Sequence, residues 1–311
     1  MAQKFGTIVL ASLAGLLATG AADAGVIRHV FVIAMENTDR DKIYKDRSSS
    51  TAYLQTLLRD YAHADNFIDE LPGFYSEPHY LWMEAGTNVF SDHTFTRKDD
   101  ADASRSNSTG SGDHLVAQIK GDAKLSWMTY QEGVAAGSCP IRSGGDHYAA
   151  KHNPFVFFQD VSGDPPSPTN AYCAAHVKPY KALAQDLHAN DVADYVFITP
   201  NLCNDMHGAF LCNSDHVGAG DSWLKSQLPP LVSWAKDHSG VIFVTWDQGS
   251  VTNQMPFIAI GPGVKPGYAG AVRYGLLSLA AVLRPSFDAP LCRRPPQMRG
   301  FEPMAPRPER P

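Results

Sequence analysis

The feature that most constrains this chain is a repeated alternation of short apolar runs with segments of helical periodicity. The run Val30-Phe31-Val32-Ile33-Ala34 is rich in β-branched residues and is typical of a strand buried on both faces. Further runs of this kind lie at 125–130, 195–198, 241–246 and 257–260. Segments with helical spacing of apolar residues lie at 54–61, 115–119, 180–187, 223–234 and 276–283. The alternation predicts an α/β fold with a mostly parallel central sheet and helices on both faces.

The first residues have the pattern of an export signal. Lys4 supplies a positive charge, residues 8–17 form an apolar run, and Ala22-Asp23-Ala24 gives a small-x-small cleavage pattern. An uncleaved membrane anchor or a buried helix is the alternative, but the run is shorter than the ~20 residues that span a bilayer. We therefore predict a signal peptide over residues 1–24 and a soluble protein that is secreted or periplasmic, with no stable membrane insertion.

The size and composition indicate a packed globular protein. A chain of 311 residues with 44% hydrophobic and 19% charged residues suits one large α/β domain or two small ones. We assign residues 25–292 to one folded domain and the Pro- and Arg-rich residues 293–311 to a flexible tail. Residues 92–112 are polar and predict a long surface loop beside the functional site. The formal net charge of -6 gives no reason to expect a nucleic-acid partner, and an anionic substrate would need local positive charge, most simply a bound cation.

The cysteines favour disulfides over a zinc site, because the protein is predicted to be exported and no C-x-x-C pair occurs. Cys203 and Cys212 are close enough in sequence to close a small loop. Cys139 and Cys173 would form the other natural pair, which leaves Cys292 unpaired. Sequence alone leaves the connectivity open.

Polar residues follow two of the predicted strands at the point where each strand ends. Glu36-Asn37 follows the first strand, and Asp247-Gln248 follows the run at 241–246. Ligands of open parallel sheets bind beyond the carboxyl ends of the strands, and these side chains offer the hard oxygen ligands that divalent cations prefer. The alternative is that Glu36 and Asp247 only cap helices or bind loop amides. Their joint placement favours a divalent metal site.

Ser76 is the candidate nucleophile. Pro78 suits the first turn of a helix, and residues 79–85 continue that helix to Gly86. Ser76 would then lie beside backbone N–H groups and a helix dipole that favour phosphate, and a nearby base or metal would activate its hydroxyl. The alternative is a common serine N-cap.

Two further polar clusters follow or flank strand ends. Asp205 and His207 follow the strand at 195–198 and are close enough to act together, as an oriented general acid or as ligands. His152 lies in the cluster Lys151-His152-Asn153-Pro154. The alternative for each histidine is an ordinary hydrogen-bonded polar group.

In order along the chain, these motifs resemble the bacterial phosphoesterase family of secreted acid phosphatases and phospholipases C, which is related to the alkaline-phosphatase superfamily. The resemblance covers about residues 29–283. The matching segments are His29-Val30 with Met35-Glu36-Asn37, Ser76-Glu77-Pro78-His79-Tyr80, Leu125-Ser126-Trp127 with Tyr130 and Glu132, Lys151-His152-Asn153-Pro154, Pro200-Asn201 with Asn204-Asp205-Met206-His207, Asp221-Ser222-Trp223-Leu224, Thr245-Trp246-Asp247 and Ile260-Gly261-Pro262-Gly263-Val264.

The resemblance implies an alkaline-phosphatase-like fold and a metal bound by Glu36, Asn37 and the residues at 247–248. It also implies that Ser76 passes through a phosphoseryl intermediate and that Asp205 and His207 belong to the site, and we count His152 as catalytic with them. The compact length looks more like the small acid phosphatases than the larger phospholipases.

Three positions depart from the family pattern. His79 replaces the Asn that usually follows the nucleophile's proline, Gln248 replaces an acidic residue, and Arg273 lies near the position where a His is expected. We assign His79 and Arg273 to substrate binding. We assign Gln248 to the metal site, where it brings one negative charge fewer than the acidic residue that it replaces.

The sequence thus predicts an exported, metal-assisted hydrolase of phosphomonoesters, acting at mildly acidic pH on a small phosphorylated substrate or a phospholipid. One alternative is a phospholipase C that cleaves a phosphodiester. The other is a degenerate family member that binds phosphorylated ligands without turnover, motivated by His79, Gln248 and Arg273.

Overall fold

The computed structural model describes residues 27–122, 124–262 and 264–276. The predicted signal peptide, the predicted tail, Cys292 and residues 277–283 of the last predicted helix lie outside this part of the chain. None of the helices in the described part combines the length and the hydropathy that crossing a bilayer requires.

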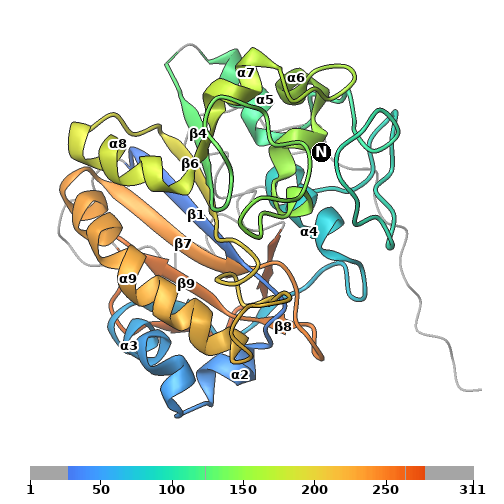
Figure 1. Ribbon diagram of the computed structural model, residues 1–311. Helices are drawn as coiled ribbons and strands as arrows, with labels where there is room; N and C mark the ends of the chain where they lie inside the picture. The colour runs from blue at the N-terminus through green and yellow to red at the C-terminus, as the bar shows by residue number, and fades with distance from the viewer. Residues whose placement is uncertain (1–26, 123, 263, 277–311) are drawn as a thin grey trace, which may run out of the picture.

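The main sheet crosses the middle of the molecule (Figure 1). Within the described residues it has eight strands, in the order β10 (Ala269–Gly270), β2 (Ala62–Ala64), β9 (Phe257–Ile260), β7 (Gly240–Trp246), β1 (His29–Met35), β6 (Tyr195–Thr199), β4 (Trp127–Gln131) and β5 (Val177–Pro179). Strands β7, β1, β6, β4 and β5 are parallel to one another, and β9 pairs antiparallel with both β7 and β2. The prediction of a mostly parallel sheet is confirmed.

A smaller sheet and the helices complete the described part. The small sheet has the order β11 (Tyr274–Gly275), β3 (Phe67–Ile68) and β8 (Gln254–Met255). The helices are α2 (Arg40–Tyr44), α3 (Ala52–Asp60), α4 (Ser76–Ala85), α5 (Leu115–Gly121), α6 (Gln159–Ser162), α7 (Ala171–His176), α8 (Leu183–Ala189) and α9 (His216–Asp237), with 3-10 turns η1 (Ser49–Thr51), η2 (Ala150–His152), η3 (Pro154–Phe157) and η4 (Tyr180–Ala182).

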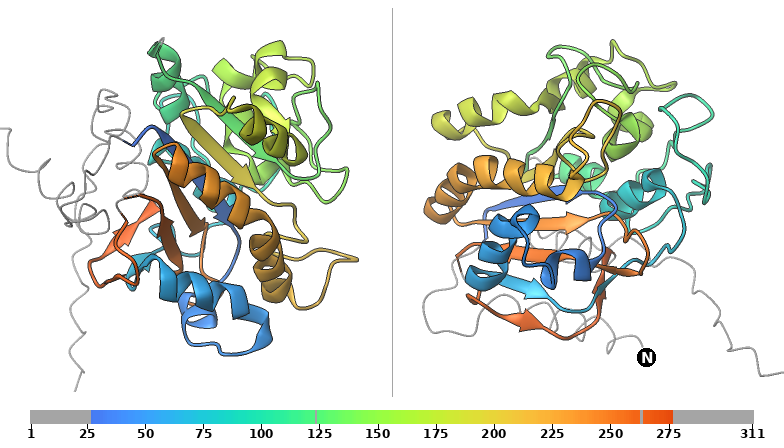
Figure 2. Two further views of the ribbon diagram at one scale, coloured as in Figure 1. Left: turned by 90° about the vertical axis from the view of Figure 1, so that its left-hand side faces the viewer. Right: turned by 60° about the horizontal axis from the view of Figure 1, so that its bottom comes forward.

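Helices cover both faces of the sheet, as predicted. On β6 the Phe197 ring meets Tyr80 of α4, with 6.4 Å between ring centroids. On β1 the Phe31 ring meets Trp234 of α9 at 5.8 Å. Because Phe31 pairs with Val196, whose side chain points away from that of Phe197, α4 and α9 lie on opposite faces. Figure 2 shows α9, the long orange-yellow helix, along one face of the twisted sheet.

Two helices differ from the predicted bounds for identifiable reasons. The helix predicted over 223–234 begins already at His216, because the side chain of Asp215 caps it by accepting a hydrogen bond from Gly218 N at 3.0 Å. Helix α4 begins at Ser76 and ends where Gly86 adopts a left-handed conformation, φ 70°, the predicted glycine stop.

The two cysteine pairs favoured by the sequence are both bonded, Cys139 to Cys173 and Cys203 to Cys212. The second bond closes the loop between β6 and α9. The segment 92–112 has no helix or strand of its own, as predicted, but it is tied down on both sides. Ala101 N donates to Glu77 at 2.8 Å, and Lys151 pairs with Asp100 at 2.5 Å.

Candidate active site

The candidate site lies where β1, β6 and β7 end side by side (Figure 1). Met35 of β1 pairs with Trp246 of β7, so the residues that follow them, Glu36 and Asp247, are neighbours. Asn37 N donates to Asp247 Oδ1 at 3.0 Å. On the other side of β1, Glu36 N donates to the carbonyl of Asp205 at 2.7 Å. The sheet register therefore brings together three carboxylates that are far apart in sequence.

The turns that carry these side chains contain unusual backbone conformations. Asn37 has φ 37° and Met206, between Asp205 and His207, has φ 80°. Asparagine tolerates this region better than most residues, whereas methionine does not, so Met206 must be held by its surroundings. Its sulfur accepts hydrogen bonds from Thr38 Oγ1 at 3.7 Å and Trp246 Nε1 at 3.4 Å. Strained backbone of this kind is concentrated at functional sites.

Ser76 reaches the same cluster from the first turn of α4. Its hydroxyl donates to Glu36 Oε2 at 3.1 Å, and Gln248 Nε2 donates to Ser76 Oγ at 3.4 Å. The helix N-cap is Tyr75, and no side chain caps it. Ser76 therefore does not act as the N-cap, and its buried hydroxyl is directed at the carboxylates.

His152, from η2, lies between two of the carboxylates. Its Nε2 is 3.1 Å from Glu36 Oε1 and its Nδ1 is 3.3 Å from Asp205 Oδ2, but neither contact has hydrogen-bond geometry. The ring stacks on Tyr80, with 4.9 Å between centroids and 9° between planes. Burial, with the nearby charge of Lys151, lowers the pKa of His152 to about 3, so the ring is neutral.

His207 lies at the edge of the cluster and is half-buried. Its backbone N–H donates to Asp205 Oδ1 at 2.8 Å, and its Nδ1 is 2.7 Å from the carbonyl of Gly208. A carbonyl can only accept, so Nδ1 carries the proton and Nε2 is left for a ligand. The ring centroid is 5.9 Å from that of His152.

Nearby positive charge only partly offsets the carboxylates of this cluster, since Lys151 and His79 act on them but do not outweigh their burial. Burial raises the pKa of Glu36 well above its usual value, and the charges of Asp247 and Asp205 raise it further. Burial also raises the pKa of Asp205 to about 7 and that of Asp247 above its usual value. Their atoms Glu36 Oε1, Asp205 Oδ2 and Asp247 Oδ2 are buried without a hydrogen-bond partner among the described residues. Buried, unpaired carboxylate oxygens are costly unless a cation neutralises them, so the donor set fits a divalent metal ion.

The two residues predicted to bind substrate are placed differently. His79 is buried in α4, where its Nδ1 meets the carbonyl of Tyr75 at 2.8 Å and its Nε2 meets Asp69 Oδ1 at 3.0 Å. Burial opposes protonation, but the bond to Asp69 and the charge of Asp247 outweigh it and raise the pKa of His79. Both ring nitrogens are therefore engaged by the protein, which makes His79 a fixed positive charge near the site. Arg273 is exposed just before β11 and, among the described residues, makes no hydrogen bond or ion pair with the cluster.

Three residues that support the site were not assigned roles from the sequence. Asp69 orients His79, and Tyr80 stacks on His152 while its buried hydroxyl has no hydrogen-bond partner in the described part of the chain. Glu132 follows β4 and accepts hydrogen bonds from Asn201 N at 2.9 Å and Asn204 Nδ2 at 3.0 Å, which anchors the loop that carries Asp205. The sequence signal that could have identified Glu132 is its position directly after a strand.

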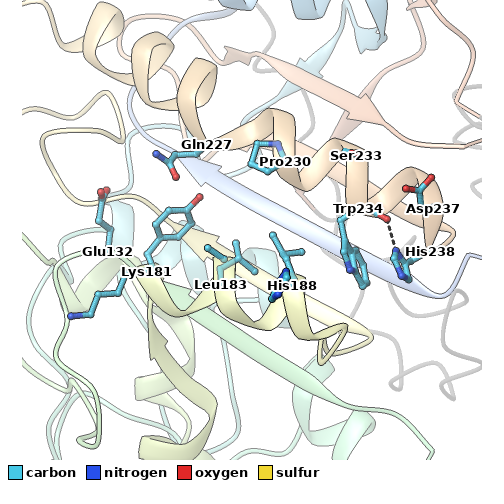
Figure 3. A pocket seen from close by; sticks show the side chains of 13 residues that line it. Glu132, Lys181, Leu183, His188, Gln227, Pro230, Ser233, Trp234, Asp237 and His238 are labelled. Carbon is cyan, nitrogen blue, oxygen red and sulfur yellow. Dashed lines mark hydrogen bonds between the residues drawn. The ribbon is translucent and has the colours of Figure 1, made fainter.

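A groove of about 610 Å³ lies elsewhere, between α8 and α9 (Figure 3). Leu183, Pro230 and Trp234 are among the residues that line it, and Glu132 lies at one end of it in Figure 3. None of the clustered carboxylates borders it. The convergence of polar groups, rather than this groove, identifies the candidate site.

Solved structures share the architecture at low sequence identity. The chain is similar to a lipoteichoic acid synthase from Listeria monocytogenes, with a TM-score of 0.50, 12% identity and coverage of 88% of this chain and 75% of that one. It is similar to a putative sulfatase from Bacteroides fragilis, with a TM-score of 0.50, 11% identity and coverage of 85% and 74%. The likeness supports the predicted α/β fold with a mostly parallel central sheet.

Sequence relatives then define the family. Residues 44–290 match the sequence profile of the Phosphoesterase family, so the chain belongs to that family. It is 28% identical to a phosphatidylinositol-3-phosphatase of Mycobacterium tuberculosis over 77% of this chain and 70% of that protein. It is 26% identical to a probable acid phosphatase of Kluyveromyces lactis over 78% of this chain and 53% of that protein. The predicted class, a phosphoric ester hydrolase, is confirmed.

Proposed function

We propose that this protein is an exported, metal-assisted acid phosphatase that hydrolyses phosphomonoesters through a phosphoserine on Ser76. The observation that carries the proposal is the hydrogen bond from the Ser76 hydroxyl to Glu36, 3.1 Å long, within a cluster of buried and unpaired carboxylate oxygens. A serine directed into such a cluster, at the start of a helix, suits attack on a phosphoryl group.

The residues of the chain divide the reaction into two steps. Ser76 Oγ attacks phosphorus while its proton passes toward Glu36, and the bond from phosphorus to the leaving oxygen breaks. His207 in its protonated form gives a proton to that oxygen through Nε2, the nitrogen not held by Gly208. Water then attacks the phosphoserine and gives a proton to His207 Nε2. The bond from phosphorus to Oγ breaks, the proton held at Glu36 returns to Oγ, and inorganic phosphate leaves. The proposal includes a mildly acidic optimum, because the relative from Kluyveromyces lactis is named as a probable acid phosphatase.

The proposed metal ligands are Glu36, Asn37, Asp247 and the amide of Gln248. A divalent cation, when bound, would increase the acidity of the Ser76 hydroxyl and offset the charge of the phosphoryl oxygens. We retain Asp205 and His152 as catalytic residues in the proposal, because His152 lies between Glu36 and Asp205, 3.1 Å and 3.3 Å from their carboxylate oxygens. His79 supplies a fixed positive charge next to Ser76, and we retain Arg273 as a proposed contact to the substrate.

The choice of a monoester is supported by the relatives. The proteins from Mycobacterium tuberculosis and Kluyveromyces lactis are both named as phosphatases. Export is supported by the two disulfides, because such bonds persist in oxidising compartments. We therefore propose a secreted or periplasmic location.

We predict that Ser76→Ala reduces release of p-nitrophenol from p-nitrophenyl phosphate by about three orders of magnitude or more, because the covalent step is lost. A chelator should abolish wild-type turnover, and an added divalent ion should restore it. Circular dichroism and thermal unfolding serve to show that the variant is folded.

Normal turnover in Ser76→Ala would overturn the mechanism. Activity on a phosphatidylcholine analogue without activity on the monoester would identify a phosphodiesterase. Binding of inorganic phosphate without turnover of either ester, in the presence of metals, would identify a ligand-binding protein instead.

A further inference from the structure

Large apolar side chains are exposed on the loops that surround the candidate site. Phe210 is 86% exposed and Leu211 83%, three and four residues after His207. Val251, 87% exposed, lies in the loop after Asp247, and Tyr75 directly precedes Ser76. These loops follow β6 and β7 or lead into α4, so they lie at the same edge of the sheet as the site (Figure 1). We call Tyr75, Phe210, Leu211 and Val251 the apolar rim.

The loop tips of the apolar rim are held firmly by the protein. The bond between Cys203 and Cys212 closes the loop of Phe210 and Leu211, and Leu211 itself has φ 71°, a strained conformation for a branched aliphatic residue. Phe210 and Leu211 are therefore exposed on a loop whose closing disulfide is adjacent to Leu211.

The loop of Val251 is held just as firmly. The Asp39 carboxylate accepts hydrogen bonds from Ser250 Oγ at 2.9 Å, Val251 N at 3.1 Å and Thr252 N at 2.7 Å. These bonds fix the backbone on both sides of the exposed valine side chain.

The three segments also lack charged side chains, although the chain as a whole carries a net charge of -6. Residues 71–76, 206–214 and 248–264 contain no Asp, Glu, Lys or Arg. Placing such tips in the interfacial region of a bilayer therefore desolvates no charged side chain of these three segments, while burial of the apolar side chains is favourable. The exposed Arg97, which hydrogen-bonds to Gly73 beside Tyr75, keeps its charge at the margin of this surface. Tyrosine and phenylalanine suit this region, because their rings are apolar and tyrosine keeps a polar end.

We propose that the apolar rim docks the protein on the surface of an uncharged lipid bilayer, with the carboxyl edge of the sheet facing the lipid. Docking would present the site to phosphoesters that lie at that surface. This use of the rim rests on the proposed function, whereas docking itself requires no turnover.

The test is co-flotation of the protein with vesicles of pure phosphatidylcholine. We expect the wild type to float with the vesicles, equally well at low and high salt, because the contact is apolar. The double variant Phe210→Ser/Leu211→Ser should bind at least about tenfold more weakly, and Val251→Ser should also bind more weakly. Ser76→Ala should float like the wild type, which separates docking from catalysis.

Val89→Ser is the matched control for Val251→Ser. Val89 is 58% exposed but lies beyond the other end of α4, away from Ser76, so its loss should leave flotation unchanged. All variants are compared with the wild type by thermal unfolding, so that a misfolded protein is not read as a loss of docking.

Three results would overturn the proposal. They are absence of wild-type flotation, flotation that salt removes, and flotation that survives in the double variant. Concentration-dependent dimerisation that the double variant abolishes, without vesicle binding, would assign the rim to contact with a second copy of the chain.

Discussion

Glu36 belongs to both proposed roles of the site, activation of Ser76 and metal binding. One of its carboxylate oxygens accepts the Ser76 hydrogen bond, and the other has no hydrogen-bond partner among the described residues. It is fully buried beside Asp205 and Asp247, which repel its charge. Such an arrangement costs stability when no cation is bound, and the cost is recovered only when a cation binds.

We therefore predict that Glu36→Gln raises the unfolding midpoint of the protein in the presence of chelator, because it relieves the repulsion from Asp247 and Asp205. The same variant should lose most of the rise in unfolding midpoint that a divalent ion gives the wild type. Thermal unfolding with and without metal measures both effects.

Glu132→Gln is the control, because this carboxylate is already satisfied by Asn201, Asn204 and Trp223. Its neutralisation should destabilise the protein by roughly 1–3 kcal/mol. Equal destabilisation by both substitutions would mean that the charge of Glu36 is compensated without metal.

At the scale of elements, the end of α4 away from Ser76 is held by the Glu84 carboxylate, which contacts the His114 ring and a backbone N–H of α5. Glu84, near its last turn, lies 3.5 Å from His114 Nδ1 and accepts a hydrogen bond from Val116 N at 2.7 Å. His114 Nε2 is 3.0 Å from Asp160, which also pairs with Lys120 at 2.8 Å. One buried histidine thus connects α4, α5 and α6.

This connection predicts a pH-dependent contribution to stability. Burial alone would lower the pKa of His114, but the bonds to Asp160 and Glu84 outweigh it and raise the pKa. A raised histidine pKa contributes stability that is complete below about pH 6.5 and is lost as the pH rises through the folded-state value. His114→Gln should therefore destabilise the protein more at pH 6 than at pH 9, as measured by urea unfolding.

The partner acid behaves in the opposite sense. Burial opposes ionisation of Asp160, but His114 and Lys120 outweigh it and lower its pKa, so its contribution is present above about pH 4 and is lost as the pH falls further. In an Asp160→Asn background, the cost of His114→Gln in free energy of unfolding should differ less between pH 6 and pH 9. A cost of His114→Gln that is the same at both pH values would contradict this assignment.

At the scale of the whole molecule, the two disulfides bridge very different lengths of chain. Cys139 and Cys173 are 34 residues apart, whereas Cys203 and Cys212 are 9 apart. The longer bridge restricts the unfolded chain more.

We predict that Cys139→Ser/Cys173→Ser lowers the free energy of unfolding by about 3–4 kcal/mol and Cys203→Ser/Cys212→Ser by about 2–3 kcal/mol. Urea unfolding of each double variant and of the reduced wild type checks this order. A larger cost for the short bridge would show that it stabilises the native loop rather than restricting the unfolded chain.

The sequence by itself determined the elements and the chemical types of the site. The apolar runs at 30–34, 195–198 and 241–246 became β1, β6 and β7, because runs buried on both faces leave a strong signal. Polar residues directly after those strands also predicted which edge of the sheet carries the site, since parallel strands end together. The positions of Glu36 and Asp247 directly after strands, and of Asp205 in the loop that follows β6, were therefore readable from local pattern.

Only the tertiary structure decided which atoms meet. The register of β1 against β7 places Glu36 beside Asp247, and the packing of α4 turns Ser76 toward Glu36 and not onto its own helix. The same packing engages both nitrogens of His79, whereas Arg273, just before β11, is exposed. Such pairings depend on contacts between segments far apart in the chain, which no local pattern contains.

The apolar rim is a further decision of the tertiary structure. Residues 71–76, 206–214 and 248–264 show no long apolar stretch, and nothing in any one of them predicts a docking surface. They become one feature because three connections end at the same edge of the sheet, and because a disulfide and the Asp39 carboxylate hold two of their tips outward. The sequence determined which side chains are present, and the fold determined that they surround one site.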